Sequence, residues 1–234
     1  ARSAPRVSVV AELISIVLPV YLCAGFGYAW IRMGRRYDTE LITDLIMNVG
    51  APCLVFSSIV DLEMEGGLVF EMAAAILVAI VVMLLIAAVF LRLAGLSIAT
   101  FIGPMTMPNT GNMGLPVLLF AFGAEGFALG VVIFAIMAML QFTVMIWFWE
   151  RTVSFARIFR TPLSYAVVIV AALVGLDLEP PEWTIRFTSL LGAFTVPLMQ
   201  FTLGVSLAQL KVDRIPRTAM LSAFRIGLGL GVGW

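Results

Sequence analysis

The sequence predicts an all-α integral membrane protein. Apolar residues make up 62% of its 234 residues and charged residues only 12%, whereas an average soluble domain has about 45–50% apolar and about 25% charged residues. A mean hydropathy of +1.10 leaves too little polar surface to keep such a chain in water. The charged residues also divide the chain into apolar runs close to the length of about 20 residues that a helix needs to cross a bilayer.

The charges mark out eight expected spans. They lie at about 12–31, 41–60, 70–91, 97–121, 126–149, 162–176, 187–209 and 218–234. The fourth span cannot be one straight helix, because residues 93–124 are uncharged and three Pro, three Gly and two Asn crowd into 103–116. We therefore expect a broken helix that crosses the membrane once.

The distribution of cations predicts the orientation, because Lys and Arg accumulate on the cytoplasmic side of a membrane protein. With the N-terminus outside, the inner loops hold ten cations: Arg32, Arg35, Arg36, Arg92, Arg151, Arg157, Arg160, Lys211, Arg214 and Arg217. The outer side holds three: Arg2, Arg6 and Arg186. The sequence thus predicts an outside N-terminus in a plasma membrane, the inner membrane if the source is bacterial. It places the loops at 32–38, 150–161 and 210–217 in the cytoplasm.

A weak internal repeat relates the second and seventh spans. At an offset of 145 residues, Gly50-Ala-Pro-Cys-Leu-Val-Phe56 aligns with Thr195-Val-Pro-Leu-Met-Gln-Phe201, and Pro52 matches Pro197. The copies are an odd number of spans apart, so they cross the membrane in opposite senses. Inverted repeats of this kind are typical of secondary transporters.

The broken span holds the best candidate binding site. Two of the three Asn of the chain, Asn109 and Asn112, lie in it together with Pro108, Thr110 and Pro116. Irregular backbone at membrane depth is tolerated only where it is buried in protein or lines a cavity. Half-helix N-termini and amide groups facing a cavity favour an anion. The alternative is a kinked structural helix in which the Asn cap their own loose ends.

The motif Pro108-Asn-Thr-Gly-Asn-Met-Gly-Leu-Pro116, followed by Phe122-Gly-Ala-Glu-Gly126, resembles the auxin efflux carrier family of secondary transporters. This family includes plant efflux carriers and bacterial malate and malonate permeases. The resemblance implies ten helices in two inverted five-helix repeats, whose fourth and ninth helices are broken and cross beside the substrate. It would make 1–149 the first repeat, 150–161 a cytoplasmic loop and 162–234 an incomplete second repeat. Pro108, Asn109, Asn112 and Pro116 would correspond to the substrate site.

Other polar residues at membrane depth have competing interpretations. Asp44 and Asn48 share a helical face and could bind a coupling H+ or Na+, or simply be solvated near the inner interface. Gln200 lies three residues after Pro197, where the repeat would place it near the cavity. Arg225 either extends to the inner interface or provides a countercharge for the substrate.

The expected function is secondary transport of a small organic anion by alternating access, with a carboxylate bound at the broken helix. The alternative is a membrane scaffold or receptor-like bundle without transport. No enzyme is expected, because the chain has no His and only one Lys, which excludes Ser-His triads and His-based zinc sites. The expected partners are the carboxylate and the lipid bilayer, with no cofactor, metal or nucleic acid, and a homodimer is left open.

The end of the chain leads to one further expectation. Residues 218–234 would form about 25 Å of helix, less than the roughly 30 Å hydrocarbon core. The resemblance implies a second broken helix beyond this point, in about 70–80 further residues. We therefore expect a chain of these 234 residues to insert without transporting.

Overall fold

The computed structural model describes residues 9–60, 66–141, 161–176, 178–210 and 215–233, and the regular elements in these segments are all helices. The all-α prediction is confirmed. The α-helices are α1 (Val9–Arg32), α2 (Thr39–Leu45), α3 (Ala51–Val60), α4 (Gly66–Leu93), α5 (Ile98–Thr106), α6 (Leu115–Leu140), α9 (Pro162–Gly175), α10 (Glu182–Ala193), α11 (Thr195–Gln209) and α12 (Ile215–Gly233). Two short π-helical turns, η1 (Ile46–Gly50) and η2 (Thr110–Gly114), precede α3 and α6.

Five segments of the described chain are long and apolar enough to cross a membrane: Leu13–Arg32, Thr39–Val60, Glu71–Leu93, Ile98–Leu140 and Glu182–Gln209. A further apolar helix, Pro162–Gly175, is shorter. Apolar side chains on α1 and α4 are exposed, including Phe26 at 70% and Val78 at 65%. Such surfaces need lipid around them, because water would not solvate them. The structure thus fits an integral membrane protein.

Some expected spans differ from the observed helices. Of the span expected at 218–234, residues 218–233 lie in α12, which is not among the five apolar segments, and Trp234 is outside the described residues. The expected span at 126–149 also extends beyond Gln141 into residues outside the described ones. Also outside them are most of the loop at 150–161, the cations Arg2, Arg6, Lys211 and Arg214, and the acidic residues near 61–65. The division into two repeats and the orientation in the membrane stay predictions.

Both π-helical turns end two residues before a proline. Gly50 is followed by Ala51 and Pro52, and Gly114 by Leu115 and Pro116. A proline has no N–H, and its ring crowds the carbonyl four residues earlier, so the preceding turn widens. Accordingly, the N–H of Ala51 reaches back five residues to Ile46, and that of Leu115 reaches Thr110.

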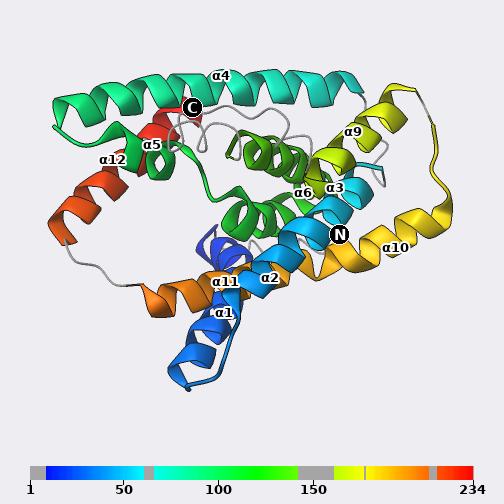
Figure 1. Cartoon of the computed structure of the whole chain (residues 1–234), viewed down its shortest axis with the longest axis horizontal. Coiled ribbons are helices and arrows are strands. Elements are labelled where there is room, and N and C mark those ends of the chain that lie inside the picture. Colours follow the sequence, from blue (N-terminus) through cyan, green and yellow to red (C-terminus); the bar gives the residue numbers. More distant parts are fainter. Residues whose placement is uncertain (1–8, 61–65, 142–160, 177, 211–214, 234) are drawn as a thin grey trace, which may run out of the picture.

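The buried apolar side chains of the described helices form two larger clusters beside the broken segment, and a small third cluster of Ile80, Met107 and Met137 joins α4 to α6 at the break. One apolar cluster joins α3, α6, α9 and α11, and a second joins α4, α5 and α12. Figure 1 shows α4 along one edge with α5 and α12 at one end of it, while α10 and α11 follow one another along the other side. Residues of α5 belong to the cluster with α4 and α12, whereas the start of α6 belongs to the cluster with α3, α9 and α11. The chain therefore passes from one larger cluster to the other between α5 and α6.

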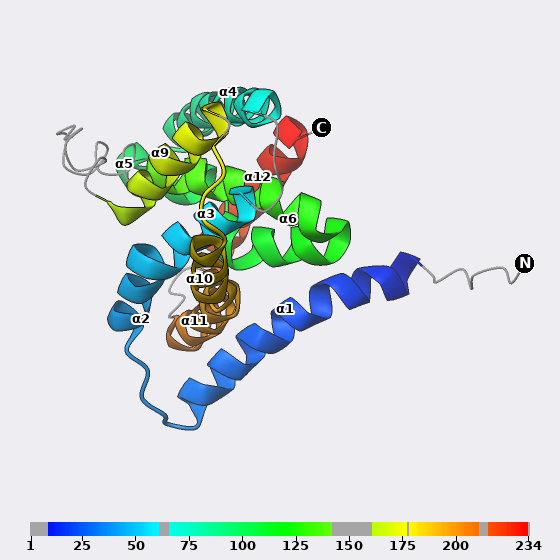
Figure 2. The same ribbon diagram turned by 90° about the vertical axis from the view of Figure 1, so that its right-hand side faces the viewer.

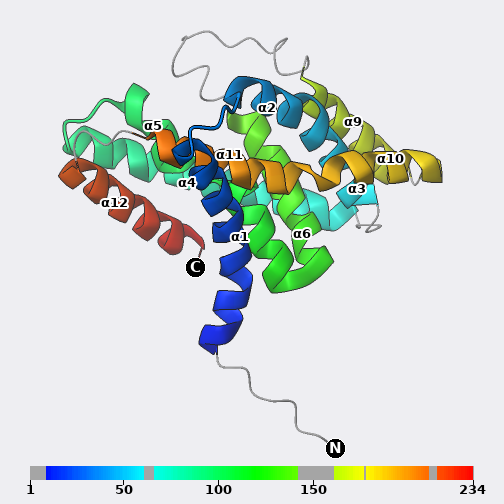
Figure 3. The same cartoon turned by 90° about the horizontal axis from the view of Figure 1, so that it is seen from below.

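Helix α1 crosses α11 at close range and then extends away from the other helices toward the N-terminus (Figure 2, Figure 3). Two glycines make the crossing possible. A Cβ on Gly27 would overlap the backbone carbonyl of Phe201, and one on Gly204 would overlap that of Ala24. Beside the crossing, the hydroxyls of Tyr37 and Thr202 are 2.6 Å apart in a hydrogen bond. Glycine thus sets the distance between the two helices.

Candidate functional site at the helix break

The break between α5 and α6 begins at Met107, whose backbone is extended (φ −87°, ψ 112°). The next residue is Pro108, and the residue before a proline is sterically pushed out of the α-helical region. The chain resumes a helical turn only at Thr110. The expected broken helix is therefore present, and its position follows from the local sequence.

Asn109 holds the end of this break in place. Its side-chain Oδ1 accepts a hydrogen bond from the backbone N–H of Asn112 at 3.2 Å, and its backbone oxygen accepts one from Gly114 at 3.2 Å. An Asn at a helix N-cap satisfies a donor that the helix itself cannot. Asn109 thus caps η2. Capping is the role that the alternative interpretation of the sequence gave to the two Asn.

A cavity of about 660 Å³ lies at the break. Its walls are formed by Met47, Gly103, Pro104, Met107, Pro108, Asn109, Thr110, Gly111, Asn112, Phe134, Ala138, Gln141, Met199 and Arg225. This volume is within the range of about 300–1,000 Å³ found for small-molecule sites. Polar groups come mainly from the break itself, whereas Met47, Phe134 and Met199 form an apolar wall. The combination of a few polar groups with an apolar wall is typical of a site for a small organic molecule.

Gly111 brings the break close to that apolar wall. It is buried, and a Cβ at this position would overlap the terminal methyl of Met199 and crowd the ring of Phe134. The methyl of Met199 is the end of a flexible side chain and can move aside, so the ring of Phe134 in the second part of α6 is the tighter limit at this position. This contact could not be predicted from the sequence, because it depends on how distant helices pack.

Gly123 turns the chain inside α6. Its φ of 69° and ψ of −156° interrupt the helical backbone. A positive φ is accessible to glycine at little cost. The part of α6 before Gly123 belongs to the broken segment, and the part after it returns with Phe134 and Ala138 to the cavity wall.

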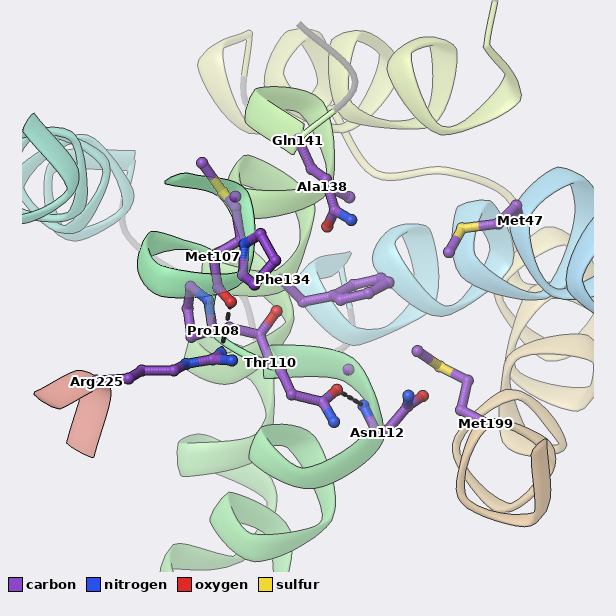
Figure 4. A pocket seen from close by; sticks show the side chains of 14 residues that line it. Met47, Met107, Pro108, Thr110, Asn112, Phe134, Ala138, Gln141, Met199 and Arg225 are labelled. Carbon is purple, nitrogen blue, oxygen red and sulfur yellow. Dashed lines mark hydrogen bonds between the residues drawn. The ribbon is translucent and has the colours of Figure 1, made fainter. Parts of the chain in front are cut away.

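Arg225 enters the cavity from α12 (Figure 4). Its Nη2 donates a hydrogen bond of 2.6 Å to the backbone oxygen of Met107, at the end of α5. A cation is favourable at the C-terminus of a helix, where the unpaired carbonyls carry partial negative charge. Within the described parts of the chain, Arg225 is the only charged residue that lines this cavity.

The structure places four of the predicted site residues, Pro108, Asn109, Thr110 and Asn112, in the cavity wall. The other two, Pro116 and Gln200, are buried but do not line the cavity. Pro116 instead lies in the first turn of α6, directly after the widened turn η2. Whether any of these residues binds a substrate stays a prediction.

Asp44 and Asn48 lie away from this cavity on exposed positions of α2 and η1. The amide nitrogen of Asn48 donates to the backbone oxygen of Asp44 at 2.9 Å, a bond within the helix. Their suggested role in coupling to an ion also stays a prediction. Within the part of the chain that the structure describes, no group of three or more Cys, Asp or Glu could hold a metal ion.

Gly103 and Pro104 were counted from the sequence only among the helix-breaking residues, and five further cavity residues were not singled out: Met47, Phe134, Ala138, Gln141 and Met199. Only the internal repeat offered a signal, since Met199 lies beside Gln200 and two residues after Pro197. Methionine and phenylalanine in an apolar helix otherwise resemble any core or lipid-facing residue.

Comparison with known proteins agrees with this architecture. A search of curated proteins finds no match to the chain. The family model described as membrane transport protein matches residues 12–153, which include the broken helix and the part of α6 that lines the cavity. The match covers more than half of the chain, which therefore belongs to this auxin efflux carrier-like family of membrane transport proteins.

Proposed function

We propose that this membrane transport protein carries a small organic anion, and that the carboxylate of the anion binds at the break between α5 and α6. The observation that carries the proposal is the cavity at the break, lined by the amide-bearing Asn109 and Asn112 and by the hydroxyl of Thr110. These groups stand at the N-terminal end of η2 and α6, where the helix dipole favours negative charge.

The contacts of η1 and α3 with α10 and α11 support an inverted repeat. A Cβ on Gly50 would overlap the side chain of Thr195, the position aligned with Gly50 at the 145-residue offset. Further along, a Cβ on Gly192 would meet the backbone of Leu54 at 3.0 Å. From Gly50 to Leu54 the residue numbers rise, while those of the contacted residues fall from Thr195 to Gly192. The two segments therefore pack antiparallel, as two copies related by a two-fold axis would.

The two packing groups offer a basis for alternating access. The break lies where the cluster of α4, α5 and α12 meets the cluster of α3, α6, α9 and α11. A movement of one group against the other would change the shape of the cavity at the break. Secondary transporters commonly work by such movement of one bundle around a fixed site.

The orientation and the coupling ion complete the proposal. The cation distribution favours an outside N-terminus in a plasma membrane. Arg35 and Arg36 are exposed between α1 and α2, as residues of a cytoplasmic loop would be. Asp44, exposed near that loop, is the candidate for coupling to H+ or Na+.

The experiment is uptake of labelled mono- and dicarboxylates by the protein encoded by the full gene, reconstituted in vesicles. We expect uptake of at least one carboxylate by the natural protein and little by the Asn112→Ala variant. Exchange of Asp44 for Asn serves as a separate test of ion coupling. A properly inserted natural protein that takes up no carboxylate would favour the alternative, a scaffold without transport.

A further inference from the structure

We propose that Arg225 is the residue that binds the carboxylate of the substrate and that it selects an anion with a single negative charge. This inference rests on the proposed function and adds the charge of the substrate and the residue that recognises it. The observations on Arg225 are separate from those on the Asn residues of the break, because Arg225 belongs to α12, more than a hundred residues further along the chain.

The position of Arg225 on α12 is the first argument. It is the eleventh residue of the helix, which begins at Ile215, and the stretch from Thr218 to Gly233 contains no other charged residue. An arginine in such an apolar stretch of a membrane protein is costly and is found facing a cavity or a partner, where it usually has a function.

The contacts of Arg225 are the second argument. Its Nη2 donates to the backbone oxygen of Met107, so the guanidinium is held at the break instead of extending toward the helix end (Figure 4). A guanidinium has five N–H donors in a planar fork that matches a carboxylate. The bond to Met107 uses one of them and fixes the side chain in the cavity wall. Further donors are then available to a carboxylate next to the break.

The composition of the cavity wall is the third argument. Arg225 is the only charged residue among the described residues that line it, and the opposite wall is formed by Met47, Phe134 and Met199 (Figure 4). One carboxylate would find a countercharge and the nearby amides. A second carboxylate would face methionine and phenylalanine without a countercharge, which is unfavourable in a site of low polarity. The site therefore fits an apolar monocarboxylate better than a dicarboxylate.

The alternative role for Arg225 is structural. It could only neutralise the C-terminal carbonyls of α5 and so stabilise the break. A binding role and a capping role differ in one measurable respect. Only a residue that contacts the carboxylate determines how strongly the site prefers an acid over its uncharged amide.

The test measures equilibrium binding of propionate, benzoate and malonate, with propionamide and benzamide as uncharged analogues. Propionate and malonate both have three carbons and differ in one carboxylate. The variants are Arg225→Gln, Arg225→Lys, Asn112→Ala and the control Arg217→Gln. Arg217 is also on α12, but its guanidinium lies over the ring of Phe101 at 4.5 Å and does not line the cavity.

We expect the natural protein to bind a monocarboxylate more tightly than malonate and far more tightly than the amide. Arg225→Gln should lower the affinity for the acid by about 30-fold or more, the usual effect of removing one partner of a buried charge pair. It should also abolish the preference for acid over amide. Arg225→Lys should keep part of that preference, and Arg217→Gln should keep all of it.

Three results would overturn the proposal. If Arg225→Gln retained the preference for acid over amide, Arg225 would have only a capping role. The proposed function would still stand in that case if Asn112→Ala lost carboxylate binding. Malonate bound more tightly than propionate by the natural protein would contradict selection of a single charge. Failure of the natural protein to bind any carboxylate would contradict both the charge selection and the proposed function. Far-UV circular dichroism of each variant in detergent identifies any that fail to fold.

Discussion

At the scale of single residues, the two Asn of the break have different positions and should have different roles. The side chain of Asn109 accepts a hydrogen bond from the backbone N–H of Asn112, whereas the side chain of Asn112 lines the cavity without that capping bond. Asn109 is therefore needed for the shape of the break, and Asn112 for what the break binds.

Asn112→Ala should weaken carboxylate binding without changing stability. Loss of one hydrogen bond to a charged group costs about 1.5–3 kcal/mol, which is a reduction in affinity of more than tenfold. The Asn109 cap uses the backbone N–H of residue 112, which alanine keeps. Isothermal titration and thermal unfolding in detergent measure the two quantities. Unchanged affinity in this variant would remove Asn112 from the site.

Asn109→Ala and Asn109→Asp should separate capping from binding. Alanine removes the cap and should lower the free energy of unfolding by about 0.5–2 kcal/mol, whereas Asp caps a helix as well as Asn does. The Asp carboxylate also adds a negative charge to the cavity, which should repel an anion. We thus expect Asn109→Asp to be as stable as the natural protein and to bind a carboxylate poorly. Tight binding by this stable variant would contradict an anionic substrate.

Residues of the break could be predicted from the sequence because their chemistry is local. Pro108, two Asn and several Gly in one apolar run already indicate irregular backbone. Gln200 shows the limit of such reasoning. The repeat pointed to the correct turn of α11, but the residue that lines the cavity is Met199, its immediate neighbour. Adjacent helical residues point about 100° apart, and only packing decides which one faces the cavity.

At the scale of elements, the crossing of α1 and α11 depends on two glycines that have no room for a side chain. Gly27 and Gly204 each lie against backbone atoms of the other helix, which cannot move aside as a side chain would. Gly25 is on the same helix as Gly27 with open space around its Cβ position. The chain thus contains its own matched control for helix packing.

Gly27→Ala and Gly204→Ala should each destabilise the protein by about 1–3 kcal/mol, because overpacking forces the two helices apart. Gly25→Ala should leave stability unchanged or raise it by up to about 1 kcal/mol, since alanine is the better helix former. Thermal unfolding in detergent compares the three variants. Equal melting temperatures for Gly25→Ala and Gly27→Ala would show that the helices do not cross here.

Charge and hydropathy predicted where most helices lie, but not the interruptions inside them. The expected span at 41–60 contains η1, and the span at 187–209 is interrupted at Phe194 between α10 and α11. Pro52 and Pro197 follow these interruptions, so the cause is visible in the sequence. The kind of interruption cannot be predicted from the sequence, because a proline can kink a helix, widen one turn or end the helix, depending on what packs nearby.

At the scale of the whole molecule, the cation distribution predicts the orientation. Cysteines introduced at Arg35 and Arg157 should resist an impermeant thiol reagent in intact cells and react after permeabilisation. A cysteine at Glu179, on the opposite side, should react in intact cells. These variants need Cys23 and Cys53 replaced by Ala, to exclude a background from the natural thiols. Rapid labelling of position 35 or 157 in intact cells would reverse the orientation.

The contact of α12 with the break could not be predicted, because it joins residues 118 positions apart in the chain. Sequence reasoning identified Arg225 as a cation within a membrane helix and allowed a countercharge role toward the substrate, but it offered no protein group as its partner. Whether it reaches the interface or a cavity depends on the packing of α12 beside α4 and α5. The contact of Arg225 with the break thus depends on long-range packing, which local sequence patterns do not reveal.

The most direct test of the central claim is protection of the break by its substrate. Thr110 lines the cavity, so a cysteine placed there in a protein without Cys23 and Cys53 should react with a small permeant thiol reagent. We predict that saturating propionate or benzoate slows this reaction, that the corresponding amide does not, and that a cysteine at Arg35 is unaffected by either. An equal rate at position 110 with and without every carboxylate tested would contradict an anion site at the broken helix.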